Sequence, residues 1–190
     1  KLLDNVKAVP GVEAAVPAVR RLSTLFAHGQ RVNLQVHGID ADLDPLVHDH
    51  NFSAGRMVSE DDDLMIDAHL AKRLKVQMGD EVKLLTDRRL QTFHVVGLVE
   101  PQQGAALQQA GLLYITLKRA QYVFRATGKL DVIQVVLKRD VEVEEAQERI
   151  ARVIPAELQV RPPTMNSKLM KETLFGSEQG LRLATLFSLL

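Results

Sequence analysis

Cysteine and tryptophan are absent from this chain of 190 residues, and tyrosine occurs only twice. Without cysteine the chain can form no disulfide, no thiolate metal site and no cysteine nucleophile. The scarcity of large aromatic side chains also argues against an aromatic cage for a ligand. Several common classes of enzyme and metal protein are therefore excluded by composition alone.

An excess of one charge is also lacking, because 24 Lys and Arg residues balance 24 Asp and Glu residues. A neutral chain gives no electrostatic reason to expect nucleic acid, since phosphate binding needs a basic surface. No run of about 18 apolar residues predicts a complete membrane span, and no signal-peptide pattern opens the chain. The apolar run at residues 183–190 predicts either the start of a membrane helix, which we favour, or a buried terminal helix.

The familiar catalytic and nucleotide-binding motifs are missing as well. The chain contains no Walker lysine loop, no Gly-x-Gly-x-x-Gly and no Gly-x-Ser-x-Gly elbow. Its contents of 46% hydrophobic and 25% charged residues are those of an ordinary globular domain. The residues by themselves thus predict a mixed α/β domain without a recognisable active site, and no cofactor.

The residue pattern predicts an α+β fold in which two distant segments build one α/β sandwich. Residues 1–37 predict a helix and then two strands, the second of which alternates strictly between apolar and polar side chains at 31–37. Residues 131–163 predict a β-branched strand, an amphipathic helix and a short final strand. This order is that of a split βαβ sandwich.

Two further regions complete the predicted organisation. Residues 38–130 are rich in predicted strands and form an inserted β-rich subdomain, in which Asp67 is placed to cap a helix. Residues 164–190 predict a C-terminal stalk helix that leads to a membrane span. The stalk residues are Gly176 and Gly180, which weaken the helix, and an apolar stripe of Leu183, Leu186, Phe187 and Leu190.

His48 and His50 are weak candidates for metal ligands. Two imidazoles that lie two residues apart on an extended segment point the same way and could share an ion. The spacing fixes no third ligand, although His37 and His69 are candidates. We therefore expect a polar surface loop and no specific metal site.

Two polar segments are candidates for contact with a partner protein. The first is an acidic run before a predicted strand, in which we single out Asp61 and Asp62; the alternative is a solvated face. The second is the loop at residues 101–111, rich in Gln, Gly and Ala, in which we single out Gln103, Gly104 and Gln108.

A set of short phrases occurs in a fixed order along the chain. They are Val9-Pro10-Gly11-Val12-Glu13, Gly38-Ile39-Asp40, Gly79-Asp80-Glu81-Val82, Val95-Val96-Gly97 and Asp131-Val132-Ile133-Gln134-Val135. Each phrase is weak alone, but their order and spacing resemble the extracytoplasmic core domain of MacB-like and FtsX-like ABC transporter permeases. The resemblance covers nearly the whole chain.

The resemblance implies a domain between the first and second membrane helices of a bacterial inner-membrane permease, on the periplasmic side. It implies a porter-like α/β subdomain interrupted by a small β-rich subdomain, without catalytic residues. Permeases of this family dimerise and work with a cytoplasmic ATPase domain or subunit, and some meet a periplasmic adaptor or lipoprotein. The implied function is mechanotransmission, in which ATP-driven movement of the membrane helices is coupled to export or to partner handling.

Two other functions stay open. A lipoprotein- or small-ligand-binding domain requires a large apolar pocket between the subdomains. A metal-dependent hydrolase built on His48, Asp49 and His50 requires a third ligand and a cleft, which the sequence does not supply.

Overall fold

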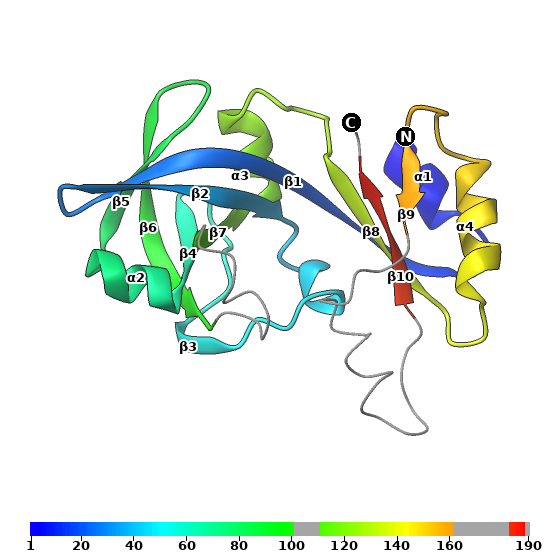
Figure 1. Ribbon diagram of the computed structural model, residues 1–190, viewed down its shortest axis with the longest axis horizontal. Helices are drawn as coiled ribbons and strands as arrows, with labels where there is room; N and C mark the ends of the chain where they lie inside the picture. Colours follow the sequence, from blue (N-terminus) through cyan, green and yellow to red (C-terminus); the bar gives the residue numbers. More distant parts are fainter. Residues whose placement is uncertain (101–110, 162–182, 189–190) are drawn as a thin grey trace. The chain divides into compact units, whose positions relative to one another are not determined.

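The computed structural model describes residues 1–100, 111–161 and 183–188 (Figure 1). These residues form a mixed fold of strands and short helices that divides into two compact units. Unit 1 contains residues 1–18, 42–49 and 130–190, and unit 2 contains residues 19–41 and 50–129. Among the described residues, no helix is both long and apolar enough to cross a membrane.

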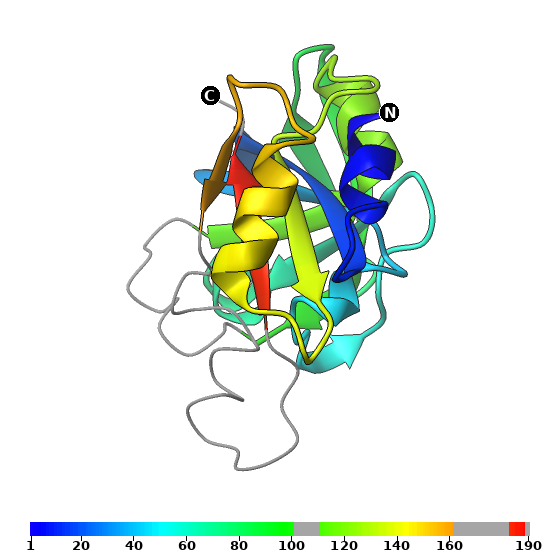
Figure 2. The same ribbon diagram turned by 90° about the vertical axis from the view of Figure 1, so that its right-hand side faces the viewer.

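Unit 1 is an antiparallel sheet with two helices packed against it. Its strands follow the order β1-β8-β10-β9, where β1 is Val12–Ala27, β8 Val132–Leu137, β10 Leu183–Ser188 and β9 Gln159–Arg161. The helices are α1 (Leu2–Lys7) and α4 (Val143–Ala151), which appear beside the sheet in Figure 2 in blue and yellow. A short 3-10 helix, η1 (Asp44–Leu46), also belongs to this unit.

Strand β8 is buried on both faces, which explains its continuous run of β-branched residues. On one face, Ile133, Val135 and Leu137 pack in a core cluster with residues of α1 and α4. On the other face, Val136 packs with Val47, next to η1. The alternation of side chains along a strand assigns these residues to opposite sides.

Unit 2 is a sheet that closes on itself. Its strand order is β2-β7-β4-β6-β5-β1, and β2 pairs with β1 to complete the ring. The pairs β2–β7 and β4–β6 are parallel, whereas β4–β7, β5–β6 and β1–β5 are antiparallel. The elements are β2 (Gln30–Ile39), β3 (Phe52–Gly55), β4 (Asp63–Asp67), α2 (Ala68–Leu74), β5 (Glu81–Leu85), β6 (Leu90–Val99), β7 (Gly111–Thr116) and α3 (Leu117–Val123).

The helices of unit 2 are placed by capping residues and by close approach to glycines. The Asp67 side chain accepts a hydrogen bond from the Leu70 N–H at 2.8 Å, so the predicted cap of α2 is confirmed. A Cβ on Gly38 of β2 would lie 2.2 Å from the Ala120 Cβ of α3. Only glycine allows this helix to pack so closely on the strand.

The division into units differs from the predicted boundaries. Residues 19–37, which we expected in the α/β sandwich, belong to unit 2, and residues 42–49 belong to unit 1. The reason lies in β1, whose first half pairs with β8 whereas Leu25 and Phe26 pair with β5. A single long strand thus contributes to both units.

The predicted C-terminal helix is wrong at residues 183–188, which form strand β10. Leu183, Leu186 and Phe187, which we assigned to a helical stripe, are Cα partners of Val136, Gln134 and Ile133 in β8. A short apolar run does not distinguish a helix from a buried strand by periodicity alone. The other stalk residues, Gly176, Gly180 and Leu190, lie outside the described residues.

Candidate functional site

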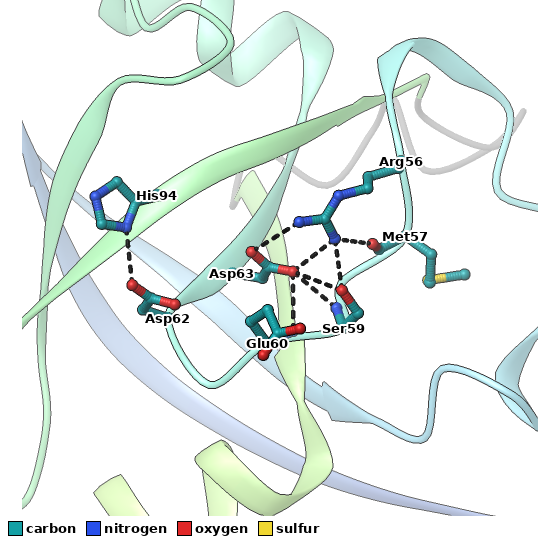
Figure 3. Close-up of polar contacts among 7 residues, drawn as sticks. All are labelled: Arg56, Met57, Ser59, Glu60, Asp62, Asp63 and His94. Atoms are coloured by element: carbon teal, nitrogen blue, oxygen red, sulfur yellow. Dashed lines mark hydrogen bonds and ion pairs between the residues drawn. The ribbon is translucent and has the colours of Figure 1, made fainter.

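The acidic run at residues 60–63 contains one buried residue, Asp63, and three exposed ones. Figure 3 shows the polar contacts of Asp62 and Asp63. Asp63 is only 4% exposed. Its carboxylate accepts hydrogen bonds from Arg56 Nη1 at 2.7 Å and Nη2 at 3.3 Å, and from the Ser59 and Glu60 N–H groups at 2.8 and 2.9 Å. Asp63 therefore closes the loop from residue 56 to residue 63 instead of facing a partner.

The charge of Asp63 is stabilised by these donors. Burial by itself raises the pKa of the Asp63 carboxyl group. The hydrogen bonds from Arg56, Glu60 and Ser59, with the positive charge of Arg56, outweigh burial and hold the pKa below its ordinary value. The same contact raises the pKa of Arg56. The pair is thus ionised wherever the chain is folded near neutral pH.

The two predicted contact residues, Asp61 and Asp62, are exposed. The Asp62 carboxylate lies 3.0 Å from His94 Nδ1, and the second ring nitrogen of His94 lies 3.3 Å from Glu81 Oε1. The backbone N–H of His94 also donates a hydrogen bond of 2.8 Å to the backbone carbonyl oxygen of Asp62. Asp62 is therefore held at the surface of unit 2 by strand β6, with its side chain 55% exposed.

The two candidate metal ligands are assigned to different units. In unit 1, His48 Nδ1 lies 3.1 Å from Oδ1 of the fully buried Asp44, and its Nε2 lies 3.3 Å from the Gln134 amide nitrogen. In unit 2, the His50 ring makes an edge contact with Tyr114, with ring centroids 5.0 Å apart. Both ring nitrogens of His48 are therefore used in contacts within the protein.

The remaining predicted contact residues, Gln103, Gly104 and Gln108, lie outside the described residues. One residue that sequence reasoning missed is Arg56, which turns Asp63 inward. Residues 56–62 form no helix or strand, so neither helical nor strand periodicity could predict the contact between Arg56 and Asp63.

Comparison with models of protein families identifies the family to which the chain belongs. Residues 1–153 match the model of the MacB-like periplasmic core domain. The chain belongs to this family, and it is an extracytoplasmic domain of a MacB-like ABC transporter permease. Such permeases pair with ATPase partners, and the family's periplasmic domain is generally non-catalytic.

Three solved structures share the fold. The extracellular domain of the noncanonic ABC-type transporter YknZ from Gram-positive bacteria has a TM-score of 0.61 at 14% identity, covering 96% of this chain and 86% of that one. The periplasmic region of MacB from Actinobacillus actinomycetemcomitans has a TM-score of 0.59 at 15% identity, covering 94% and 83%. A domain of a putative permease protein from Porphyromonas gingivalis has a TM-score of 0.55 at 15% identity, covering 98% and 77%.

Comparison with curated proteins gives no significant match. The predicted family resemblance and the predicted α+β class are confirmed by the family match and by these shared folds.

Proposed function

We propose that this domain couples ATP-driven movement of the permease's membrane helices to events on the extracytoplasmic side. The observation that carries the proposal is that helix α1 and strand β10, which are far apart in the sequence, both contact the same sheet strand, β8, in unit 1. Helix α1 packs on the sheet through Val6, and β10 pairs directly with β8. A displacement at either end therefore acts on one hydrogen-bonded structure.

The sheet of unit 1 is suited to transmit such a displacement. Antiparallel pairing joins β1, β8, β10 and β9 in succession, so force on β10 is shared by its two neighbours. Strand β1 then continues into unit 2, where it pairs with β5. In this proposal the segment from Gly176 to Leu190 is membrane-proximal, and the acidic surface at Asp61 and Asp62 is available for a partner.

The proposal includes a second copy of the permease and an ATPase domain or subunit, and it can be tested without knowing the substrate. Leu22 of unit 2 is 79% exposed, and the domain contains no cysteine. In the full-length permease with its ATPase, L22C allows the two copies of the domain to be joined by bis-maleimides of increasing length.

If the domain moves with the nucleotide state, a restraint that blocks this movement disfavours conformations that the nucleotide cycle must pass through. We expect the shortest bis-maleimide that joins the copies to lower the rate of ATP hydrolysis severalfold. A monofunctional maleimide on L22C is the matched control and leaves the rate unchanged. An unchanged rate in the crosslinked permease would show that the domain is mechanically independent of the ATPase.

The alternative, binding of a lipoprotein or small ligand, requires an apolar pocket of about 300–1,000 Å³. Within unit 1, the apolar cavity between Leu2, Val6, Ile133 and Ile154 holds about 10 Å³. This volume accepts at most one water molecule, so an acyl chain does not fit there. A larger hollow of about 460 Å³ in unit 2 has charged residues in its lining, among them Arg31, Glu81 and Lys83, so it is not an apolar pocket. Neither of these two cavities supports the alternative.

A further inference from the structure

Two arginines of unit 2 lie beside the ring of Tyr122. Arg88 comes from the turn between β5 and β6, and its Cζ lies 4.1 Å from the centroid of the Tyr122 ring. Its Nε donates a hydrogen bond of 2.8 Å to the Tyr122 carbonyl oxygen. Arg119, one turn earlier on α3, has its Cζ 5.7 Å from the same centroid. The turn and the helix thus place two guanidinium groups next to one aromatic ring.

These two guanidinium groups have no carboxylate partner among residues 1–100, 111–161 and 183–188. Arg119 Nη2 donates to the neutral Gln91 side chain at 3.1 Å. Its Nε is buried without an acceptor in the described part of the chain. Two like charges at one ring repel each other, so a negative charge placed between or beside them is favoured.

The cluster offers a defined set of donors. The Tyr122 carbonyl group accepts the Nε–H of Arg88, so the two terminal nitrogens of Arg88 remain as a fork that can bind a carboxylate. The Tyr122 residue is 49% exposed and supplies apolar surface beside this fork. Arginine and tyrosine are among the residue types enriched at the positions that contribute most to protein–protein binding.

The exposure of the cluster indicates the size of its partner. A small anion on an open surface is screened by salt and stays solvated. A protein segment that covers the Tyr122 ring removes water from both arginines, which strengthens their electrostatic attraction. We propose that Arg88, Arg119 and Tyr122 bind an acidic segment of a separate protein, with a carboxylate on the guanidinium groups and an apolar side chain on the ring. This inference is independent of the coupling proposal.

The test measures binding of a fluorescently labelled peptide, Glu-Glu-Phe-Glu-Glu, to this chain by fluorescence anisotropy. We expect saturable binding that weakens at least tenfold in R88Q/R119Q. The matched control K118Q/R125Q removes the same charge from exposed positions on and just after α3, and should weaken binding less than threefold. In ¹H–¹⁵N spectra, the Nε–H signals of Arg88 and Arg119 should shift during the titration.

A double variant that fails to fold does not decide the question, so circular dichroism is recorded first. In that case R88Q alone, a change in an exposed turn, must weaken binding at least threefold. Four results would overturn the proposal: no saturable binding, equal weakening in the control variant, tighter binding of phosphatidylglycerol vesicles or pyrophosphate than of the peptide, or self-association of the chain that R88Q/R119Q abolishes.

Discussion

Replacement of Asp63 by asparagine tests whether the loop before β4 depends on a buried charge. The Asp63 carboxylate accepts hydrogen bonds from the Arg56 guanidinium group, from the Ser59 hydroxyl group and from the Ser59 and Glu60 N–H groups. Asparagine keeps the shape of the side chain but replaces one acceptor oxygen with a donor. At least one of the present donors is then left without an acceptor.

The expected loss follows from the burial of each partner. Hydrogen bonds to a charged group contribute about 1.5–3 kcal/mol each, and removing one partner of a buried ion pair costs about 3–5 kcal/mol. The Arg56 side chain is 53% exposed, so water solvates its charge after the substitution. D63N should therefore lower the free energy of unfolding by about 2–3 kcal/mol, below the range for a fully buried pair.

The contribution of Asp63 to the free energy of unfolding should decrease at low pH. The pKa of Asp63 is lower in the folded chain than its value of about 3.9 in an unfolded chain. The unfolded chain therefore binds the proton first, and the contribution of Asp63 is complete above the unfolded pKa and lost as the pH falls through the folded pKa. The difference in stability between the wild-type chain and D63N should be constant above about pH 5 and shrink below about pH 4.

Urea denaturation followed by far-ultraviolet circular dichroism measures this difference, since the chain has no tryptophan. The matched control is D62N, because the Asp62 side chain is 55% exposed and the loss of its charge should cost about 0.5 kcal/mol or less. An equal loss in both variants, or a D63N effect that is the same at low pH, would refute the account of the loop.

Three further predictions concern packing and register. G38A should destabilise the chain by about 1–3 kcal/mol, because its Cβ meets Ala120, and the added change A120G should recover part of the loss. I150A should cost about 2–5 kcal/mol, because Ile150 of α4 is fully buried in the core of unit 1. Q134C/L186C should form a disulfide on mild oxidation, because these residues are Cα partners in β8 and β10.

Two of these predictions have a matched control variant close by in the chain. V153A, two residues after the end of α4, removes a side chain that is 38% exposed. In urea denaturation it should lower the free energy of unfolding clearly less than I150A does. Q134C/T185C places the second cysteine out of register, so slower crosslinking on a non-reducing gel is expected. Equal crosslinking of both pairs would contradict the pairing of β10, and a fully tolerated G38A would contradict the close approach of α3.

Much of the fold could be predicted from periodicity. The strict alternation at residues 31–37 predicts β2, and the β-branched run from Val132 predicts β8. Apolar steps of three and four residues predict α4. The path of β1 could not be predicted, because its division between two units depends on pairing with β8 and β5 far along the chain. Strand β10 was missed for the same reason, since its partners decide between strand and helix.

The candidate site, too, could be predicted from the sequence only in part. The exposure of Asp61 and Asp62 agrees with what an acidic run predicts, and their role in partner contact stays a prediction. Asp63, the next residue in the run, is buried because Arg56 and two backbone N–H groups surround its carboxylate. Only the tertiary structure separates these neighbours, since nothing in the composition of the run distinguishes them.

The most direct test of coupling is a distance measurement between the two copies of this domain in the full-length permease with its ATPase. A spin label on L22C reports the position of unit 2, because Leu22 is 79% exposed. Pulsed electron paramagnetic resonance would compare the ADP state with a non-hydrolysing ATP state. The coupling account predicts that the distance distribution between the two labels shifts with the nucleotide. An unchanged distribution in a permease that still hydrolyses ATP would contradict it.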